Sequence, residues 1–427
     1  MKSGPLVTSA HYRHPFRPAP IAAANALGRK LGSIGVGRID LSEEGLIATA
    51  RRRTKLRDFG DESFRPRLAL LLSSLESEAE LHPVGRFLTR EKLVGTLANR
   101  LRIAEILRRH PEIRERPLAP LVVIAGLQRT GTTLLQRLLS VDPEVRHLAS
   151  WEALNPAPSD VDRPPADRAR DLRIRTAKLA ERALAYMAPS FFAIHPVEAL
   201  APEEDVLLLD LSFLSTVPEA TYHVPSFAAW LETQDHRAAY RELATTLAVL
   251  EWQHRGSRWV LKTPHHLEHL DALLEVFPTA TIVQTHRDPT RVVASFCSMI
   301  AHGRGVMSDA VDPVEVGRHW LRKMERMVTR AMEARAHSDP ERFIDVLYSD
   351  LMSDPLSAVR RVYERLGVTL PDETRALMRG WLQDHPQHRH GKHRYQLADF
   401  GLDKAQVARA FQSYSARFEI PTEELPS

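Results

Sequence analysis

Cysteine is almost absent from the sequence, because Cys297 is the only one among 427 residues. Such a chain forms no intramolecular disulfide, which is typical of proteins in a reducing compartment. The longest apolar runs, such as Leu121–Ala125 and Val206–Leu209, are far shorter than the ~20 residues of a membrane-spanning helix. The first 20 residues also lack the apolar stretch of a secretory signal. We therefore expect a cytoplasmic protein without a transmembrane segment, and contact with a membrane surface stays open.

A strong excess of one charge is lacking as well. Lysine and arginine number 58 against 54 acidic residues, which leaves a net charge of +4. No segment combines aromatic residues with a dense basic run, so we expect no nucleic-acid partner. The hydrophobic share of 43% is ordinary for a globular protein. The length predicts one large α/β domain plus an additional region, or two domains.

The N-terminal part is predicted to be helical after an irregular start. Residues 1–38 contain proline and glycine without a clear period. From Ser42 to Ile113 apolar residues recur every three to four positions, and no strand-like alternation interrupts them. Several prolines then mark a boundary. We therefore divide the chain into an irregular lead-in (1–38), a helical extension (39–115) and a main domain (116–427).

The main domain shows alternating strand and helix patterns. Leu121–Ala125 is a short apolar run typical of a strand buried on both faces. Further strands are expected at 259–261, 281–283 and 343–348. Each of the four strands is followed by an expected helix, at 132–140, at 267–277, starting at 289, and at 356–366. Longer helices are expected at 167–188 and 239–255. This order predicts an α/β fold of three layers, with a central parallel sheet between two layers of helices.

The first strand is followed by Gly126-Leu-Gln-Arg-Thr-Gly-Thr-Thr133, which opens a helix. A helix start attracts phosphate or sulfate through its unpaired N–H groups and the positive end of its dipole. Gly131 allows close approach of the backbone, and Arg129 adds a permanent charge. The alternative is a tight turn without a ligand.

The match to the common nucleoside-triphosphatase loop is only partial. That loop requires a lysine where Thr132 stands. No later strand ends in an evident magnesium-binding aspartate, because the strands end near Lys262, His286 and Tyr348. A nucleotide kinase or phosphohydrolase with a degenerate loop is therefore the alternative function.

A second strand-to-helix junction lies at Arg287-Asp288-Pro289. Asp288 suits a helix N-cap and Pro289 the first helical position. Arg287 would thus stand at the carboxyl end of a parallel strand, where ligands of open α/β sheets bind. Ser295 follows eight residues later, about two turns into the helix. A helix cap beside a surface arginine is the alternative.

Together these patches resemble sulfotransferases that use 3′-phosphoadenosine 5′-phosphosulfate (PAPS), in particular the tyrosylprotein and heparan types and bacterial members. The resemblance extends over about residues 118–402. It implies a P-loop-type fold, PAPS as co-substrate, adenosine 3′,5′-bisphosphate (PAP) as product, and no required metal. It assigns Arg287 and Ser295 to the 3′-phosphate, and the 5′-phosphosulfate to Gln128, Arg129, Thr130, Gly131, Thr132 and Thr133. A non-catalytic PAP-binding protein stays open as a third function.

The resemblance also implies roles in the chemistry. Glu152 is predicted as the base, with His147 as its competitor. Lys262 and Arg129 are predicted to stabilise charge on the sulfuryl and bridging oxygens. Residues expected to touch or close over the nucleotide are Tyr348, Lys392 and His393.

Other polar groups fit more than one role. Glu203, Glu204 and Asp205 precede an apolar run, where they would cap a helix or line the acceptor pocket. His265 and His269 have i, i+4 spacing, but we expect surface or nucleotide-side positions and no metal site. The acceptor is open among lipid, steroid, phenol, glycan and peptide hydroxyls and amines, and a homodimer is possible.

Overall fold

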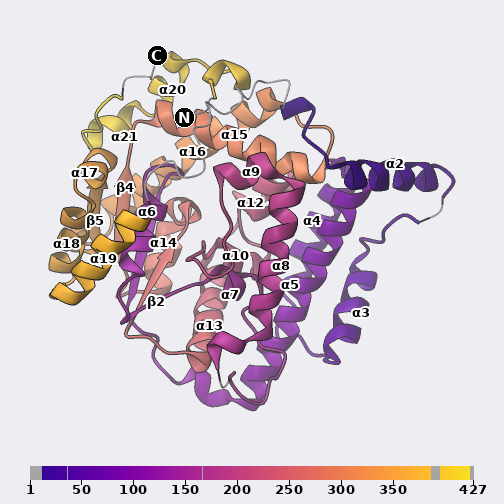
Figure 1. Cartoon of the computed structure of the whole chain (residues 1–427), viewed down its shortest axis with the longest axis horizontal. Helices are drawn as coiled ribbons and strands as arrows, with labels where there is room; N and C mark the ends of the chain where they lie inside the picture. Colours follow the sequence, from indigo (N-terminus) through magenta and orange to yellow (C-terminus); the bar gives the residue numbers. More distant parts are fainter. Residues whose placement is uncertain (1–11, 36, 166, 386–394, 424–427) are drawn as a thin grey trace.

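The computed structural model describes residues 12–35, 37–165, 167–385 and 395–423. At its centre is a parallel sheet of five strands in the order β2-β3-β1-β4-β5 (Figure 1). The strands are β1 (Leu121–Gly126), β2 (Val145–His147), β3 (Arg258–Lys262), β4 (Thr281–His286) and β5 (Phe343–Leu347). The central parallel sheet predicted from the sequence is confirmed.

Helices cover both faces of the sheet. Successive side chains of a strand point to opposite faces, so β1, β3, β4 and β5 each contribute to two apolar clusters. In β1, Leu121, Val123 and Ala125 belong to one apolar cluster, which also holds side chains of α13, α15 and α16. Val122 and Ile124 belong to another, formed with α6, α17, α18 and α19. The three-layer α/β arrangement is therefore confirmed, and the central strand β1 is an unbroken apolar run because it is covered on both faces.

In Figure 1 the N-terminal helices lie at the right, and α17–α19 lie at the left. The first group is α2 (Ala19–Ser33), α3 (Glu43–Thr54), α4 (Arg65–Ser77), α5 (Pro83–Arg109) and the 3₁₀ turn η1 (Pro111–Arg114). The second is α6 (Thr132–Leu139), α7 (Ser150–Leu154), η2 (Arg168–Arg170), α8 (Leu172–Met187), α9 (Pro189–Ile194), α10 (Val206–Leu209), η3 (Asp210–Ser212), α11 (Val217–Thr221), α12 (Pro225–Leu231) and α13 (Arg237–Gln253). The third is η4 (Pro264–His269), α14 (Leu270–Val276), α15 (Pro289–Met307), α16 (Pro313–Ala336), η5 (Pro340–Arg342), α17 (Tyr348–Ser353), α18 (Pro355–Arg365), α19 (Asp372–Asp384), η6 (Leu397–Phe400), α20 (Lys404–Ala410) and α21 (Gln412–Arg417).

The irregular start predicted for residues 1–38 is wrong over α2. This segment is rich in alanine, and its proline lies in the first turn, where a missing N–H costs nothing. Asn25 also anchors the helix, since its side-chain oxygen accepts a hydrogen bond of 2.9 Å from the Val84 amide at the start of α5. Helix propensity and a tertiary contact therefore outweigh the scattered glycines.

The predicted helical extension, 39–115, is helical over α3, α4, α5 and η1. Its apolar side chains join the same cluster as one face of the sheet. The buried Arg100 of α5 strengthens this contact, because it donates to the Leu211 carbonyl at 2.6 Å and pairs with Glu242. The extension thus shares its core with the main domain, and the boundary at 115/116 stays a prediction.

One strand was not predicted. The strand β2 has three residues and lies at the edge of the sheet, where it pairs with β3. Its middle residue, Arg146, is charged, so the segment lacks the apolar residues that reveal the other strands.

Among the residues that the structure describes, none of the helices combines the length and the apolar character needed to cross a bilayer.

Candidate functional site

The two strand-to-helix junctions lie side by side. The strands β1 and β4 are neighbours, with Gly126 in register with Thr285. The hydroxyls of Thr130 and Thr285 share a buried hydrogen bond of 2.6 Å. Beyond it, Nη1 of Arg287 donates to the carbonyl oxygen of Arg129 at 2.9 Å. The loops after β1 and β4 therefore form one continuous surface, as ligands at the edge of a parallel sheet require.

Glycines permit this close approach. A Cβ on Gly126 would lie 2.0 Å from the Thr285 hydroxyl oxygen, so no larger residue fits there. Gly131 has a φ of +89°, and a Cβ on it would lie 2.6 Å from Leu351 of α17. Arg129 also has a positive φ, +67°. The loop thus has a fixed left-handed conformation that only glycine adopts without strain at position 131.

A cavity of about 460 Å³ opens beside these loops. It is lined by Gln128, Arg129, Gly131, Thr132 and Thr133, together with Arg287 and Tyr348. Most of the remaining wall is apolar and comes from α8, α9, α10, α11, α15 and α16, with Leu184, Phe191, Val206, Val217, Ile300 and Trp320 among its side chains. The cavity thus joins a polar end at the loops to a long apolar section.

The loop side of the cavity is suited to an anion. The helix α6 begins at Thr132 without a side-chain cap, so its first N–H groups keep their hydrogen-bonding capacity. The side-chain oxygen of Gln128 is buried and has no hydrogen-bond partner among the described residues. The Thr130 hydroxyl bonds with the Leu127 carbonyl and the Thr285 hydroxyl and so joins the two loops, and its predicted contact with the nucleotide stays a prediction.

Arg287 is held between two side chains. Its guanidinium lies 3.7 Å from the ring centre of Tyr348, a cation–π contact. Its Nε and Nη2 donate to the two carboxylate oxygens of Glu423 at 2.7 and 2.8 Å. Burial works against the charge, but the bond from Glu423 raises the pKa of Arg287 above its ordinary value. A bidentate carboxylate has the geometry in which arginine also binds phosphate.

Three predicted nucleotide contacts remain, Ser295, Lys392 and His393. Ser295 is buried on α15, 2% exposed, and is not among the residues that line the cavity. Lys392 and His393 lie outside the described residues.

Glu152 was predicted as the base, and the structure places it away from the cavity. Its side chain is fully buried and accepts bidentate bonds from Arg146 at 2.9 and 2.6 Å. Arg168 and the Ala149 amide bind the same carboxylate at 3.2 Å. Burial alone would raise the pKa of Glu152, but the two arginines together lower it. Glu152 therefore stabilises the turn after β2, and its carboxylate is not free to accept a proton from a substrate.

His147, the competing base, also lies outside the residues that line the cavity. Burial, together with the charges of Arg146 and Arg168, lowers the pKa of His147 to about 4. A ring so weakly basic, and away from the cavity, is poorly placed for proton transfer.

The carboxylate that does face the cavity is Glu204. It accepts a hydrogen bond of 2.7 Å from Nζ of Lys262 and one of 3.3 Å from the Thr263 hydroxyl. Its neighbour Asp205 accepts from the Lys262 amide at 2.9 Å and lies 2.9 Å from Nε2 of His266. Asp205 therefore does not cap α10 with its side chain, and it fixes Glu204 at the carboxyl end of β3.

Two features of the site were missed by the sequence analysis. Glu204 was predicted to cap a helix or to line the acceptor pocket, but it was not considered as the base, because its contact with Lys262 joins residues 58 positions apart. Glu423 lies 136 positions from Arg287, and nothing in the local sequence links the two.

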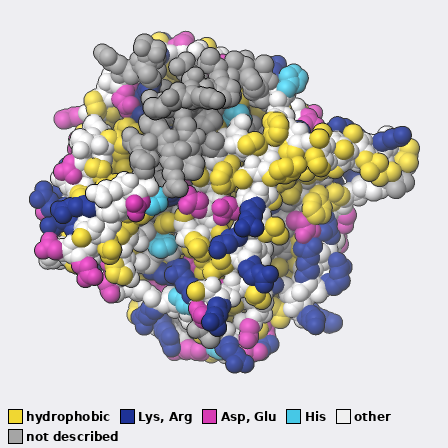
Figure 2. Space-filling model, viewed as in Figure 1, with side chains coloured by type: hydrophobic (Ala, Val, Ile, Leu, Met, Phe, Trp, Pro, Cys, Tyr) yellow, Lys and Arg dark blue, Asp and Glu magenta, His cyan; other side chains and the backbone are white. Residues whose placement is uncertain are grey.

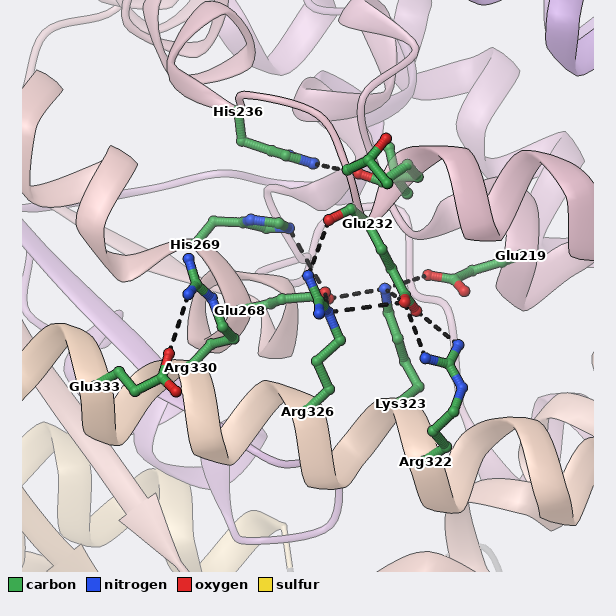
Figure 3. Close-up of polar contacts among 12 residues, drawn as sticks. Glu219, Glu232, His236, Glu268, His269, Arg322, Lys323, Arg326, Arg330 and Glu333 are labelled. Carbon is green, nitrogen blue, oxygen red and sulfur yellow. Dashed lines mark hydrogen bonds and ion pairs between the residues drawn. The ribbon is translucent and has the colours of Figure 1, made fainter.

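A network of buried charges supports the wall that follows β3 (Figure 3). Lys323 of α16 is 1% exposed and pairs with Glu268 at 2.8 Å, Glu219 at 3.2 Å and Glu232 at 3.5 Å. Arg326 donates to Glu268 at 2.5 Å. These contacts attach η4, which contains the cavity residues Pro264 and His265, to the long helix α16.

Three histidines, His236, His265 and His269, have ring nitrogens within 4.8 Å of one another. All are buried, which excludes the surface position predicted for His265 and His269, whereas the alternative, a position on the nucleotide side, stays a prediction, and His265 lines the cavity. The rings of His236 and His269 stack 3.5 Å apart, which keeps their in-plane lone pairs in parallel planes that do not converge. Burial first, and then the neighbouring His236, lowers the pKa values of His265 and His269 well below the ordinary value. We interpret the three rings as part of the packed core.

Comparison with known proteins places these features in context. A family model described as "Sulfotransferase family" matches residues 120–372. A curated relative from Mycobacterium bovis, omega-hydroxy-beta-dihydromenaquinone-9 sulfotransferase Stf3, is 28% identical over 288 residues, which cover 63% of this chain and 68% of the relative.

Two solved structures are similar over most of the chain. Sulfotransferase STF1 from Mycobacterium tuberculosis H37Rv is 33% identical with a TM-score of 0.78, covering 88% of this chain and all of that one. Sulfotransferase STF9 from Mycobacterium avium is 29% identical with a TM-score of 0.81, covering 91% of this chain and all of that one. The share of the chain that they cover exceeds residues 120–372, so both structures also match at least part of the helical extension.

Proposed function

The chain belongs to the sulfotransferase family, and we propose that it moves the sulfuryl group of PAPS to a hydroxyl of an apolar acceptor. The observation that carries the PAPS assignment is the contact between the two loops, in which Arg287 donates to the carbonyl oxygen of Arg129. One ligand with anionic groups at both ends can span these loops. The kinase or phosphohydrolase alternative is not favoured, because Thr132 stands in place of the lysine and family membership assigns sulfuryl transfer.

In this proposal the α6 start and Arg129 bind the 5′-phosphosulfate, and Arg287 binds the 3′-phosphate. The bidentate contact with Glu423 supports the second assignment, since phosphate presents a similar pair of oxygens to a guanidinium. Glu423 must then give up Arg287 when the nucleotide binds. Tyr348, which packs on the guanidinium, keeps its orientation fixed.

Proton and sulfuryl transfer are assigned to Glu204 and Lys262. The acceptor oxygen attacks sulfur, the bond from sulfur to the bridging phosphate oxygen breaks, and PAP leaves with the electron pair. Glu204 takes the acceptor proton, because it is the only carboxylate among the described residues that line the cavity. Lys262 is not itself among the residues that line the cavity, but its ammonium lies 2.7 Å from the Glu204 carboxylate, and we assign it to the charge on the departing oxygen once Glu204 has taken the proton. This replaces Glu152 as the base.

The acceptor class follows from the apolar section of the cavity. Its wall offers Leu184, Phe191, Val217, Ile300 and Trp320, which suit a hydrocarbon chain or ring system and not a glycan. The relative from Mycobacterium bovis is named for a hydroxylated menaquinone, which agrees with an alcohol as acceptor. A cytoplasmic location and a homodimer stay predictions.

The test is transfer of ³⁵S from labelled PAPS to a long-chain alcohol. We expect Glu204→Gln to lower kcat by at least ~100-fold while leaving the Kd of PAP nearly unchanged. Glu203→Gln is the matched control, because its carboxylate lies next in the chain and is not among the residues lining the cavity. Undiminished turnover in Glu204→Gln would move the base to another group.

A further inference from the structure

The outer face of α8 carries a row of exposed apolar side chains. Leu172, Leu179 and Tyr186 are 70%, 69% and 56% exposed. Their spacing of seven residues returns each to nearly the same side of the helix. Large apolar side chains exposed in a row are unusual on a soluble protein and mark a contact surface. We name these three residues the α8 stripe.

Cations lie beside the α8 stripe. Arg175, Lys178 and Arg182 are exposed, and none of them takes part in the ion pairs found among the described residues. Most other arginines in the described chain are paired, as on α16. Figure 2 shows Lys and Arg side chains next to hydrophobic ones over the region of α8, and a hydrophobic band that continues toward α2. An apolar row next to unpaired cations is the pattern of a helix that lies on an anionic membrane surface.

The same helix reaches the acceptor cavity. Leu184 of α8 lines the cavity, as do Phe191 of α9 and His195 just after it. The α8 stripe is therefore the outer side of an element whose inner side forms the cavity wall. A surface that binds the α8 stripe would therefore lie next to one wall of the cavity.

We propose that α8 docks on the surface of a bilayer that contains anionic lipids. Leu172, Leu179 and Tyr186 insert among the headgroups, and Arg175, Lys178 and Arg182 bind the lipid phosphates. Tyrosine suits this position because its ring is apolar and its hydroxyl stays in water. The inference rests on the proposed apolar acceptor, and it adds the place where that acceptor is taken up.

The test is flotation of the full chain with vesicles. We expect it to float with vesicles of phosphatidylcholine and phosphatidylglycerol, to stay behind with phosphatidylcholine alone, and to be released by salt. Leu179→Ser combined with Arg182→Gln should weaken vesicle binding about tenfold or more. The matched control is Leu377→Ser with Arg379→Gln on α19, which changes the same residue types at exposed positions elsewhere and should bind like the wild type.

Failure to float, or equal binding by both double variants, would overturn the proposal. So would a wild-type dimer that becomes monomeric in Leu179→Ser/Arg182→Gln without any vesicle binding, since a second copy would then cover the α8 stripe. A titration of the same preparations with PAP distinguishes a failure of the membrane docking from a failure of the proposed function. Wild type that binds PAP but not vesicles contradicts the docking alone, whereas wild type that does not bind PAP contradicts the proposed function.

Discussion

At the scale of single residues, the partners of Arg287 decide how the nucleotide end of the cavity behaves. Its guanidinium is satisfied by Glu423, by the Arg129 carbonyl and by the Tyr348 ring. Any anion that binds there must displace the Glu423 carboxylate and find the same two N–H donors. In the proposed binding mode, Glu423 and the nucleotide therefore compete for the Arg287 side chain.

We predict that Glu423→Gln tightens PAP binding. A neutral amide pairs with Arg287 less strongly than a carboxylate does, so less interaction is lost when the phosphate enters. The Kd of PAP measured by calorimetry should fall by about threefold to tenfold, as expected when one partly buried ion pair is weakened. Glu341→Gln, which removes a carboxylate paired with Arg365 elsewhere, should leave the Kd unchanged. A weaker PAP affinity in Glu423→Gln would contradict the competition.

Some residues of the site could be predicted from the sequence, and others could not. The sequence pointed to Arg129 and Arg287 through two strand-to-helix junctions, and the pairing of β1 with β4 brings these junctions together. Glu152 could not be judged in this way, because its distance along the chain from the loop does not tell which way its side chain points. The short strand β2 brings Arg146 beside it, and that ion pair removes Glu152 from the cavity.

At the scale of elements, the attachment of η4 to α16 holds one wall of the site. Strand β3 ends at Lys262, and the chain then turns through η4 under the cavity. Lys323 joins three carboxylates from three different segments there. Since burial raises the cost of leaving any of these charges unpaired, the cluster is stable only when complete.

We predict that Lys323→Met destabilises the fold by about 3–5 kcal/mol, because it leaves buried carboxylates without their cation. Urea unfolding followed by circular dichroism measures this loss. Arg330→Met on the same helix is the control: its pairs with Asp271 and Glu333 are exposed, so its effect should stay within ~0.5 kcal/mol. Equal stability of the two variants would show that the cluster contributes nothing beyond surface ion pairs.

Elements with a strong local signal were predictable. The strands β1, β3, β4 and β5 are short apolar runs before helices, and each was found from that pattern. Helix α2 was missed because the proline and glycine residues of the segment 1–38 were given more weight than its high alanine content. The contact of Asn25 with α5, which helps to hold it, joins residues 59 positions apart and leaves no local trace.

At the scale of the whole molecule, buried histidines make stability depend on pH. Burial lowers the pKa of His82, His147 and His236 to about 4, whereas the unfolded chain has the ordinary value near 6.5. Between these values the unfolded state binds more protons than the folded state. The free energy of unfolding therefore falls as the pH decreases through 6.5 toward 4.

We predict a clear loss of stability between pH 7 and pH 5, measured by urea unfolding at each pH. Carboxylates with lowered pKa values contribute only below about pH 4.5, so this window reports the histidines. His236→Phe removes one of them, and its loss over the same window should be smaller than that of the wild type by about 1–2 kcal/mol. A wild-type unfolding free energy that stays constant from pH 7 to pH 5 would contradict the burial of neutral histidines.

The central claim concerns the whole site, because the loops after β1 and β4 must bind the two ends of one nucleotide. The most direct measurement is calorimetry of the wild type and Arg287→Ala with PAP and with AMP, which lacks the 3′-phosphate. We predict that the wild type binds PAP about 10–100-fold more tightly than AMP, the amount expected for charged hydrogen bonds to one phosphate, and that Arg287→Ala removes this preference. Equal affinities of the wild type for PAP and AMP would contradict the account.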